Sequence, residues 1–393
     1  MAVAEQICCP ACGSADLNAV YKATLPLGDK DDTVGPQPFA LAVCRRCNLT
    51  FQTTAYRAAY DEIMARAYSS YTVNSAFPFP DRGLKNSEPL AILLAHLPAD
   101  KPLSLLEIGS NRGDLLYLLK EARPSYNVLG IEPTQFRDLQ VPTINALFRA
   151  DLFASQFDVV SLVHVLEHLK DPMTCLEHIK QLLRPGGWLY LEVPDLDLGL
   201  DNFVEDYIPD HVVYYSRATL LAMLGSAFEE VHCERTTFLR LMLRKRDEST
   251  GAQSVPPQGS ADSVAQKFQR FASQKAKVAE QLVLAAKGRK LVFYGASYYF
   301  VRLYRELQDR LSDTTCQFMD DNLAGDHEPR FGLSRADGST LQPDDIVMLA
   351  SNNFRVQERM NAALQKQGCP ARILMPWRGL FANCAEVKKF LAS

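Results

Sequence analysis

Short apolar runs alternate with amphipathic helical patterns between Leu103 and about Arg246. This alternation is typical of βαβ units, which build a parallel sheet covered by helices. The predicted strands are Leu103–Ile108, Asn127–Ile131, Asp158–Val163 and Trp188–Val193, with a further pair at Glu230–Glu234 and Thr237–Leu243. The predicted helices are Asp114–Ala122 and Pro172–Leu183, the second ended by Pro185-Gly186-Gly187. We therefore expect an α/β domain in the middle of the chain.

The rest of the chain divides by the same criteria. The polar stretch 247–263 is rich in Gly, Ser and Pro, as linkers are, and a helical pattern follows at Val264–Ala286. Three more apolar runs, Lys290–Tyr294, Cys316–Met319 and Asp345–Ala350, predict a second βαβ-like region. We expect four parts: a cysteine-bearing and helical region 1–80, the α/β domain 81–246, a linker and helix 247–286, and a second Rossmann-like α/β domain 287–393.

Composition and charge restrict the class of protein. With 393 residues the chain exceeds one compact core, and 47% hydrophobic with 22% charged residues excludes disordered and collagen-like chains. A net charge of −4 gives no indication of a positively charged surface that would bind a nucleic acid polymer. No apolar run approaches the roughly 20 residues that cross a bilayer, and the N-terminus has no secretory pattern. We therefore expect a cytoplasmic protein with reduced or metal-bound cysteines, a small-molecule partner and no membrane partner. The oligomeric state stays open.

Four of the ten cysteines form two CxxC pairs near the start of the chain. The pairs are Cys9-Pro10-Ala11-Cys12 and Cys44-Arg45-Arg46-Cys47. Two such pairs supply the four thiolates that Zn²⁺ takes in a tetrahedral site. Because protein ligands fill all four positions, a structural site is expected rather than a catalytic one. The 31 residues between the pairs exceed the usual zinc-ribbon gap, and a longer hairpin would accommodate them.

A glycine-containing turn follows the first strand of the central domain. Gly109 and Gly113 bracket this turn around Asn111, and glycines there let the backbone approach a ligand closely. The middle glycine of GxGxxG is missing, so the turn is a poor dinucleotide motif. The second strand ends at Glu132-Pro133, where a carboxylate can accept hydrogen bonds from both hydroxyls of a ribose. Together these features predict a site for a nucleotide-like cofactor.

The same segments resemble the class I S-adenosylmethionine-dependent methyltransferases. The resemblance is carried by EIGSNRGDLL, GIEPT, FDVVSLVHVLEHLKDP and LLRPGGWLYLEVPD. It implies a seven-stranded, mostly parallel sheet with helices on both faces, and S-adenosylmethionine as cofactor. By this resemblance Glu107 faces the cationic methionine end of the ligand, Glu132 binds its ribose, and His164 borders the cofactor.

With the cysteine pairs and the second Rossmann-like region, the whole chain is similar to the sugar C-methyltransferases. This resemblance implies an N-terminal zinc-binding region and a C-terminal substrate-binding domain. It also implies methylation of C-3 of a nucleotide-bound 4-keto-deoxysugar. At Tyr294-Gly295-Ala296 the chain resembles the YGA turn of that family, but Tyr298-Tyr299 replaces the lysine-glycine that often follows.

The catalytic residues are expected around His211. The sugar C-methyltransferases carry a Glu-His pair followed by an aromatic-Phe-Ser run, and the matching positions are Asp210, His211, Tyr215 and Ser216. A histidine titrates near neutral pH, so it can remove the proton beside a carbonyl and form an enolate that attacks the methyl group. Asp210 is one methylene shorter than the glutamate of the family. By the same resemblance, Tyr68 and Tyr71 lie in a tyrosine- and serine-rich stretch that lines the substrate site.

Other functions are compatible with the same motifs. An O- or N-methyltransferase of another small metabolite would use the same cofactor site, and a non-catalytic S-adenosylmethionine-binding scaffold would keep it without turnover. His168 lies where packing or helix-capping histidines are more common than ligand-binding ones. Transfer to carbon requires removal of the proton next to the acceptor carbonyl, so exchange of that proton distinguishes it from transfer to oxygen or nitrogen.

Overall fold

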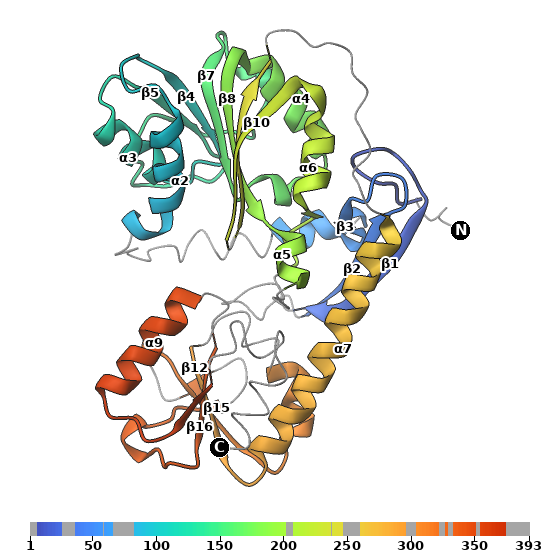
Figure 1. Cartoon of the computed structure of the whole chain (residues 1–393), viewed down its shortest axis with the longest axis vertical. Helices are drawn as coiled ribbons and strands as arrows, with labels where there is room; N and C mark the ends of the chain where they lie inside the picture. The colour runs from blue at the N-terminus through green and yellow to red at the C-terminus, as the bar shows by residue number, and fades with distance from the viewer. Residues whose placement is uncertain are drawn as a thin grey trace. The chain divides into compact units, whose positions relative to one another are not determined.

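The computed structural model describes most of the chain as two compact units (Figure 1). The described residues are 6–25, 36–57, 59–65, 82–201, 207–236, 238–246, 260–295, 304–321, 327–328, 333–350 and 354–374. The first unit comprises Met1–Ala23, Phe39–Leu198 and Ile208–Ala265, and the second comprises Thr24–Pro38, Gly199–Tyr207 and Gln266–Ser393. The four-part division stays a prediction. Among the helices in the described ranges, none combines the length and apolar character needed to cross a bilayer.

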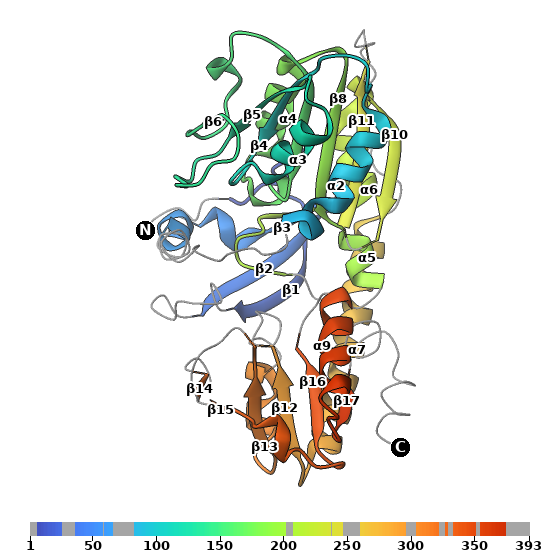
Figure 2. The same ribbon diagram turned by 90° about the vertical axis from the view of Figure 1, so that its left-hand side faces the viewer.

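The first unit is built around a mixed sheet with the strand order β10-β11-β8-β7-β4-β5-β6. Its strands are β4 (Ser104–Ile108), β5 (Asn127–Ile131), β6 (Thr143–Ile144), β7 (Phe157–Val163), β8 (Leu183–Pro194), β10 (Phe228–Arg235) and β11 (Phe238–Lys245). The strands from β8 to β6 are parallel, whereas β11 is antiparallel to both β8 and β10. In Figure 2, β6, β5 and β4 lie at one side and β8, β11 and β10 at the other. The predicted α/β fold and its terminal strand pair are confirmed.

Helices cover both faces of this sheet (Figure 1). On one face lie α2 (Arg82–His96) and α3 (Asp114–Ala122), and on the other α4 (Pro172–Leu182) and α6 (Arg217–Leu224). Asp171 caps the start of α4 and Ser216 caps the start of α6, each by accepting a hydrogen bond from the backbone N–H three residues later. Local capping and an apolar face therefore explain where these helices begin and what they cover.

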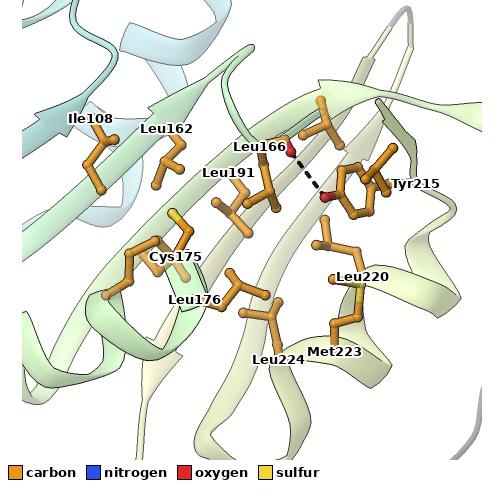
Figure 3. Packing of buried hydrophobic residues seen from close by; sticks show 14 of the residues in the cluster. Ile108, Leu162, Leu166, Cys175, Leu176, Leu191, Tyr215, Leu220, Met223 and Leu224 are labelled. Atoms are coloured by element: carbon orange, nitrogen blue, oxygen red, sulfur yellow. Dashed lines mark hydrogen bonds between the residues drawn. The ribbon is translucent and has the colours of Figure 1, made fainter. Parts of the chain in front are cut away.

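The face under α4 and α6 buries a continuous apolar core, part of which Figure 3 shows. Leu162 and Leu191 of the sheet, Leu176 of α4 and Leu220 of α6 belong to one cluster of buried side chains. Within it the Tyr215 hydroxyl donates a hydrogen bond to the Leu166 carbonyl at 3.1 Å, so the buried ring has its polar atom satisfied. This core fixes the segment before α6 against the turn after β7.

A second sheet joins the N-terminal residues to a segment far along the chain. Its strands, in the order β1-β2-β3-β9, are β1 (Leu17–Leu25), β2 (Gln37–Cys44), β3 (Thr50–Gln52) and β9 (Val213–Tyr214). β3 and β9 are antiparallel and pair Thr50 with Tyr214 and Phe51 with Val213. Backbone hydrogen bonds thus hold residues 213–214 against the N-terminal segment.

The second unit contains a parallel sheet with the order β13-β12-β16-β17. Its strands and the helix that packs on one face are β12 (Lys290–Tyr294), β13 (Thr315–Met319), β16 (Ile346–Leu349), β17 (Arg372–Leu374) and α9 (Phe354–Lys366). The other elements within the described residues are η2 (Thr53–Tyr56), η3 (Ala150–Leu152), η4 (Leu166–His168), α5 (Leu196–Asp201), η5 (Gly225–Ala227), α7 (Ala261–Ala286), η6 (Gln308–Arg310), β14 (His327–Glu328), β15 (Leu333–Ser334) and η7 (Gly338–Thr340). The three apolar runs predicted after residue 287 form β12, β13 and β16.

Candidate functional site

The turn between β4 and α3 has a backbone that requires glycine. Gly109 and Gly113 have φ of +69° and +83°, a left-handed region that side chains disfavour. A Cβ added at Gly109 would lie 2.4 Å from Val165 Cγ2, and one at Gly113 would lie 2.4 Å from Val141 Cγ2. Asn111 between them also has a positive φ, of +52°. The turn is therefore tight and packed directly against the segment that follows β7.

Glu132 ties this turn to the end of the neighbouring strand β5. Its side chain is 8% exposed. Oε2 accepts a hydrogen bond from Asn111 N at 3.0 Å, and Oε1 accepts one from Thr134 N at 2.9 Å. The Asn145 amide supports the same tip by donating to the Glu132 and Pro133 carbonyls at 2.9 and 3.1 Å. Each carboxylate oxygen can accept two hydrogen bonds, so both keep room for a ligand hydroxyl.

Glu107, the last but one residue of β4, is a buried carboxyl whose surroundings suit a cationic ligand. It is 4% exposed, and its Oε2 has no hydrogen-bond partner among the described residues. Burial, followed by the charges of Asp114 and Glu132, raises the pKa of Glu107 to about 8. A buried polar atom without a partner marks a place for a ligand atom. The ammonium group of S-adenosylmethionine fits this donor requirement.

We expect the Glu107 carboxyl to make the ligand-free protein less stable as the pH rises. Its pKa in the folded state is about 8 against the usual 4.5, so between these values the folded state holds a proton that the unfolded chain has released. The contribution of this group to the free energy of unfolding therefore falls across that range. Glu107→Gln cannot ionise, and its urea unfolding should depend less steeply on pH from about 5 to about 8. Equal slopes for the two proteins would contradict the raised pKa.

His164 follows β7 in a strained backbone conformation, with φ of +54°. Its Nδ1 lies 3.2 Å from Glu167 Oε1 and its Nε2 lies 3.2 Å from Glu192 Oε1. Burial alone would lower the pKa of His164, but the hydrogen bonds to the two carboxylates outweigh burial and raise it to about 9. The ring is therefore held as an imidazolium. The residue that follows His164, Val165, contacts the glycine turn. The contact between His164 and the cofactor stays a prediction.

A buried charge network extends from His164 into the sheet. Glu192 of β8 accepts hydrogen bonds from Arg240 Nε at 2.9 Å and from the Tyr190 hydroxyl at 2.8 Å. Arg240 also donates to Glu234 and Glu88, both at 2.6 Å. Sequence reasoning missed this network. The signal was a charged residue in each of the apolar runs LYLEVP and FLRLML, which the antiparallel register places opposite each other.

His211 lies in the stretch that leads into β9 and is 6% exposed. The backbone of this stretch is anchored on both sides. Val212 N donates to the Glu167 carbonyl at 2.7 Å, and Gln52 N donates to the Val212 carbonyl at 2.8 Å. The Gln52 amide, oriented to satisfy both its groups, donates to the His211 carbonyl at 2.9 Å. The Tyr60 hydroxyl completes this support by donating to the Pro209 carbonyl at 2.7 Å.

The turn η4 brings two more side chains to His211. One carboxylate oxygen of Glu167, one ring nitrogen of His168 and one of His211 lie within 4.8 Å of one another. His168 Nδ1 is 2.9 Å from the Asp210 carbonyl oxygen and 3.7 Å from Asp210 Oδ2. Although packing or capping was the more common role expected for His168, its ring lies 4.9 Å from that of His211. Sequence reasoning did not single out Glu167 as a functional residue.

The other residues expected at the catalytic site divide into two groups. Tyr68 and Tyr71 lie outside the described residues. Tyr215 and Ser216 have structural roles, since Tyr215 is buried against Leu166 and Ser216 caps α6. The structure therefore brings together His211, Asp210 and the turn after β7.

The four cysteines of the two CxxC pairs converge in the N-terminal part of the first unit. Cys9 Sγ and Cys47 Sγ are 3.5 Å apart, as are Cys12 Sγ and Cys44 Sγ, and all four sulfur atoms lie within 4.8 Å of one another. Zn–S bonds of about 2.3 Å in a tetrahedron place sulfur atoms about 3.8 Å apart, so the cluster fits zinc. Cys8, which also precedes Cys12, is exposed.

We expect the protein to bind one zinc ion through these four cysteines and to need it for stability. Cys9→Ser should release the metal and lower the free energy of unfolding by several kcal/mol, because metal binding and folding are coupled. Cys8→Ser is the matched control and should keep both the zinc and the stability. Elemental analysis and urea unfolding measure the two effects. Unchanged unfolding after chelation, with no metal detected, would refute the site.

Residues 82–245 match the family model described as a methyltransferase domain. This segment is a methyltransferase domain. The match confirms the expected methyltransferase domain in the middle of the chain. It includes every expected cofactor residue from Glu107 to His164 as well as His211, whereas the four cysteines precede it.

Several curated proteins and solved structures are similar to parts of the chain. A tRNA U34 carboxymethyltransferase from Syntrophotalea carbinolica is 31% identical over 159 residues, covering 37% of this chain and 48% of the relative. A ubiquinone biosynthesis O-methyltransferase from Leptothrix cholodnii is 30% identical over 104 residues, covering 23% and 43%. The structure of a 1,6-didemethyltoxoflavin-N1-methyltransferase from Burkholderia thailandensis has 19% identity and a TM-score of 0.39, covering 53% of this chain and 96% of that one. The first curated relatives are matched over 33% to 48% of their own length.

Proposed function

We propose that the chain transfers a methyl group from S-adenosylmethionine to a carbon atom of a keto-deoxysugar linked to a nucleotide. The observation that carries this proposal is the buried His211 beside the turn after β7, which also packs against the glycine turn of the methyltransferase domain. Gly109 packs against Val165, the turn containing Val165 continues into Glu167, and Glu167 lies beside His211. The turn after β7 therefore contacts both the proposed cofactor turn and the proposed base.

The cofactor site is proposed to consist of the ends of β4 and β5. Gly109, Asn111 and Gly113 would bring the backbone to the ligand, and Glu107 would receive its ammonium group. Glu132 would accept hydrogen bonds from the ribose hydroxyls, with Pro133 beside it. His164 would border the ligand at the end of β7. When bound, S-adenosylmethionine supplies an electrophilic methyl group on sulfur.

His211 is proposed as the general base. Its imidazole takes the proton from the acceptor carbon next to the carbonyl, and the electron pair of the broken C–H bond is stabilised as an enolate. S-adenosylmethionine, held by the proposed cofactor residues, would supply the methyl group that this enolate carbon accepts. We propose that Tyr68 and Tyr71 add hydroxyl groups to the acceptor pocket, and that Asp210 stays at its edge against His168.

The second unit is proposed to bind the acceptor. A cavity of about 840 Å³ lies in this unit, which is within the size range of sites for small molecules. It is lined by Asp320, Asp321 and Asp337 together with Arg335. The Tyr294 hydroxyl donates to Asp321 at 2.6 Å, which links the end of β12 to this wall. Hydroxyl groups of a sugar would find acceptors in such carboxylates.

The proposal is tested with a panel of nucleotide-linked 4-keto-deoxysugars and S-adenosylmethionine carrying a carbon-13 methyl group. We expect one sugar to gain the labelled methyl, with a carbon–carbon coupling to the ring carbon in its NMR spectrum. A labelled methyl bound to oxygen would overturn C-methylation and favour an O-methyltransferase, the activity named for the Leptothrix relative. The net charge of −4 gives no support for a tRNA acceptor.

A further inference from the structure

Glu167 is a buried carboxylate that the proposed proton transfer does not itself use. It is 1% exposed, and its Oε1 lies 3.2 Å from His164 Nδ1. Its Oε2 is also buried and has no hydrogen-bond partner among the described residues. Leaving such an oxygen without a donor is destabilising, because the buried group loses its hydrogen bonds to water. We therefore expect a nearby N–H group to donate a hydrogen bond to Glu167 Oε2.

Two imidazoles lie beside this carboxylate. The Glu167, His168 and His211 atoms that come closest lie within 4.8 Å of one another, and the two rings cross at 73°. The Nδ1 atom of His168 lies 2.9 Å from the Asp210 carbonyl oxygen. This nitrogen is therefore already hydrogen-bonded to a group other than the Glu167 carboxylate. His211 is the more buried of the two rings and is the one proposed to act on the acceptor.

The main chain holds Glu167 and His211 together. Val212 N, one residue after His211, donates to the carbonyl of Glu167 itself at 2.7 Å. The Tyr215 hydroxyl donates to the carbonyl of Leu166 on the other side of Glu167. Both residues thus sit on segments joined by backbone and buried side-chain hydrogen bonds. Catalytic groups need this kind of rigid support to stay within a few tenths of an ångström of a working geometry.

Glu167 is ionised in spite of its burial. Burial by itself would raise its pKa, but the hydrogen bond to His164 and the charges of His164, His211 and His168 outweigh burial and lower the pKa of Glu167. An ionised carboxylate can only accept hydrogen bonds. An imidazole facing it therefore has to present a nitrogen that carries a proton, which leaves the basic nitrogen on the opposite side of the ring.

We propose that Glu167 is the positioning residue of His211: it accepts a hydrogen bond from one ring nitrogen and so fixes the tautomer in which the other nitrogen takes the acceptor proton. This inference rests on the proposed function, because it presumes that His211 is the base. It assigns the orienting carboxylate to Glu167 in place of Asp210, the neighbour in sequence. Asp210 Oδ2 lies 3.7 Å from His168 Nδ1.

The first test is the NMR spectrum of the imidazole nitrogens in the full chain labelled with nitrogen-15 histidine. His211→Ala assigns the His211 signals among the seven histidines. In the wild type these signals should show a single tautomer, and in Glu167→Gln they should shift and show a mixture. Glu177→Gln removes an exposed carboxylate that pairs with Lys180, and it should leave the His211 signals unchanged. Because the spectrum needs no turnover, its result is independent of whether the acceptor is correct.

The second test is kinetic, on the acceptor that the panel identifies. Glu167→Gln should lower kcat by more than about tenfold with little change in the KM for S-adenosylmethionine, and Glu167→Asp should recover part of kcat. His211 signals that do not change in Glu167→Gln, in a variant that still binds S-adenosylmethionine, would overturn the inference. The inference would also be overturned if the wild type held a second zinc ion that Glu167→Gln releases. Glu167, His168 and His211 would then be metal ligands. If Glu167→Gln does not fold, Glu167→Asp carries the same spectroscopic test.

Discussion

Glu132→Ala should weaken the binding of S-adenosylmethionine by about 100-fold or more. Both oxygens of Glu132 already accept a backbone N–H, from Asn111 and Thr134, and this fixes the carboxylate at the tip of β5. Two charge-assisted hydrogen bonds to ribose hydroxyls are worth about 1.5–3 kcal/mol each, so their loss costs about 3 kcal/mol or more. Titration calorimetry with S-adenosylmethionine and S-adenosylhomocysteine measures the change directly.

Glu121→Ala is the matched control for this experiment. Glu121 is an exposed carboxylate on α3 of the same domain, and its removal should leave the affinity unchanged. A wild-type protein that binds neither compound would remove the basis of the cofactor site. Equal affinity of Glu132→Ala and the wild type would place the ribose elsewhere.

His211→Ala should abolish the exchange of the acceptor proton next to the carbonyl. General base catalysis contributes about 100- to 10,000-fold, so the rate of exchange in deuterium oxide should fall at least 100-fold. Binding of S-adenosylmethionine should stay at the wild-type level, because the proposed cofactor residues lie at the ends of β4, β5 and β7 and do not include His211. Proton NMR of the keto-sugar, followed in the presence of S-adenosylhomocysteine, measures exchange without methyl transfer.

His178→Ala serves as the control in the exchange experiment. His178 lies on α4 with its ring against Phe148 and is not among the proposed site residues. This variant should exchange the proton at the wild-type rate. Exchange that persists in His211→Ala would exclude this histidine as the base, while leaving the methyltransferase domain itself unaffected.

The central sheet was predictable because its strands are short and apolar and its turns carry glycine. The pattern located Asn127–Ile131 as it is observed and five other strands of the sheet with differences at their ends, but it missed the two-residue strand β6. It was also wrong about Pro185-Gly186-Gly187, which lies inside β8 rather than between a helix and a strand. The same argument found Glu107 and Glu132, since parallel strands place the residues at their ends along one edge. Predictions from such local patterns agree with the folded structure because each depends only on residues close together in the sequence.

Other parts of the site depend on contacts between distant segments. The pairing of β3 with β9 involves only three and two residues, separated by some 160 positions, and has no periodic signal. The Glu192–Arg240 pair was hidden because a single charge in an apolar strand gives no information about its partner. The proposed role of Glu167 depends on the contact between the His211 segment and η4, which the sequence does not reveal.

The β3–β9 pairing also bears on how short a fragment can be and still carry out the proposed reaction. The methyltransferase domain by sequence starts at residue 82 and contains the whole cofactor turn. Gln52 and Tyr60, which hold the backbone on either side of His211, lie before that boundary. A fragment restricted to the domain would keep the proposed cofactor residues and lose Gln52 and Tyr60, which support the backbone around the proposed base. In this chain the segment that matches the methyltransferase family model and the segments that hold His211 in place therefore have different limits.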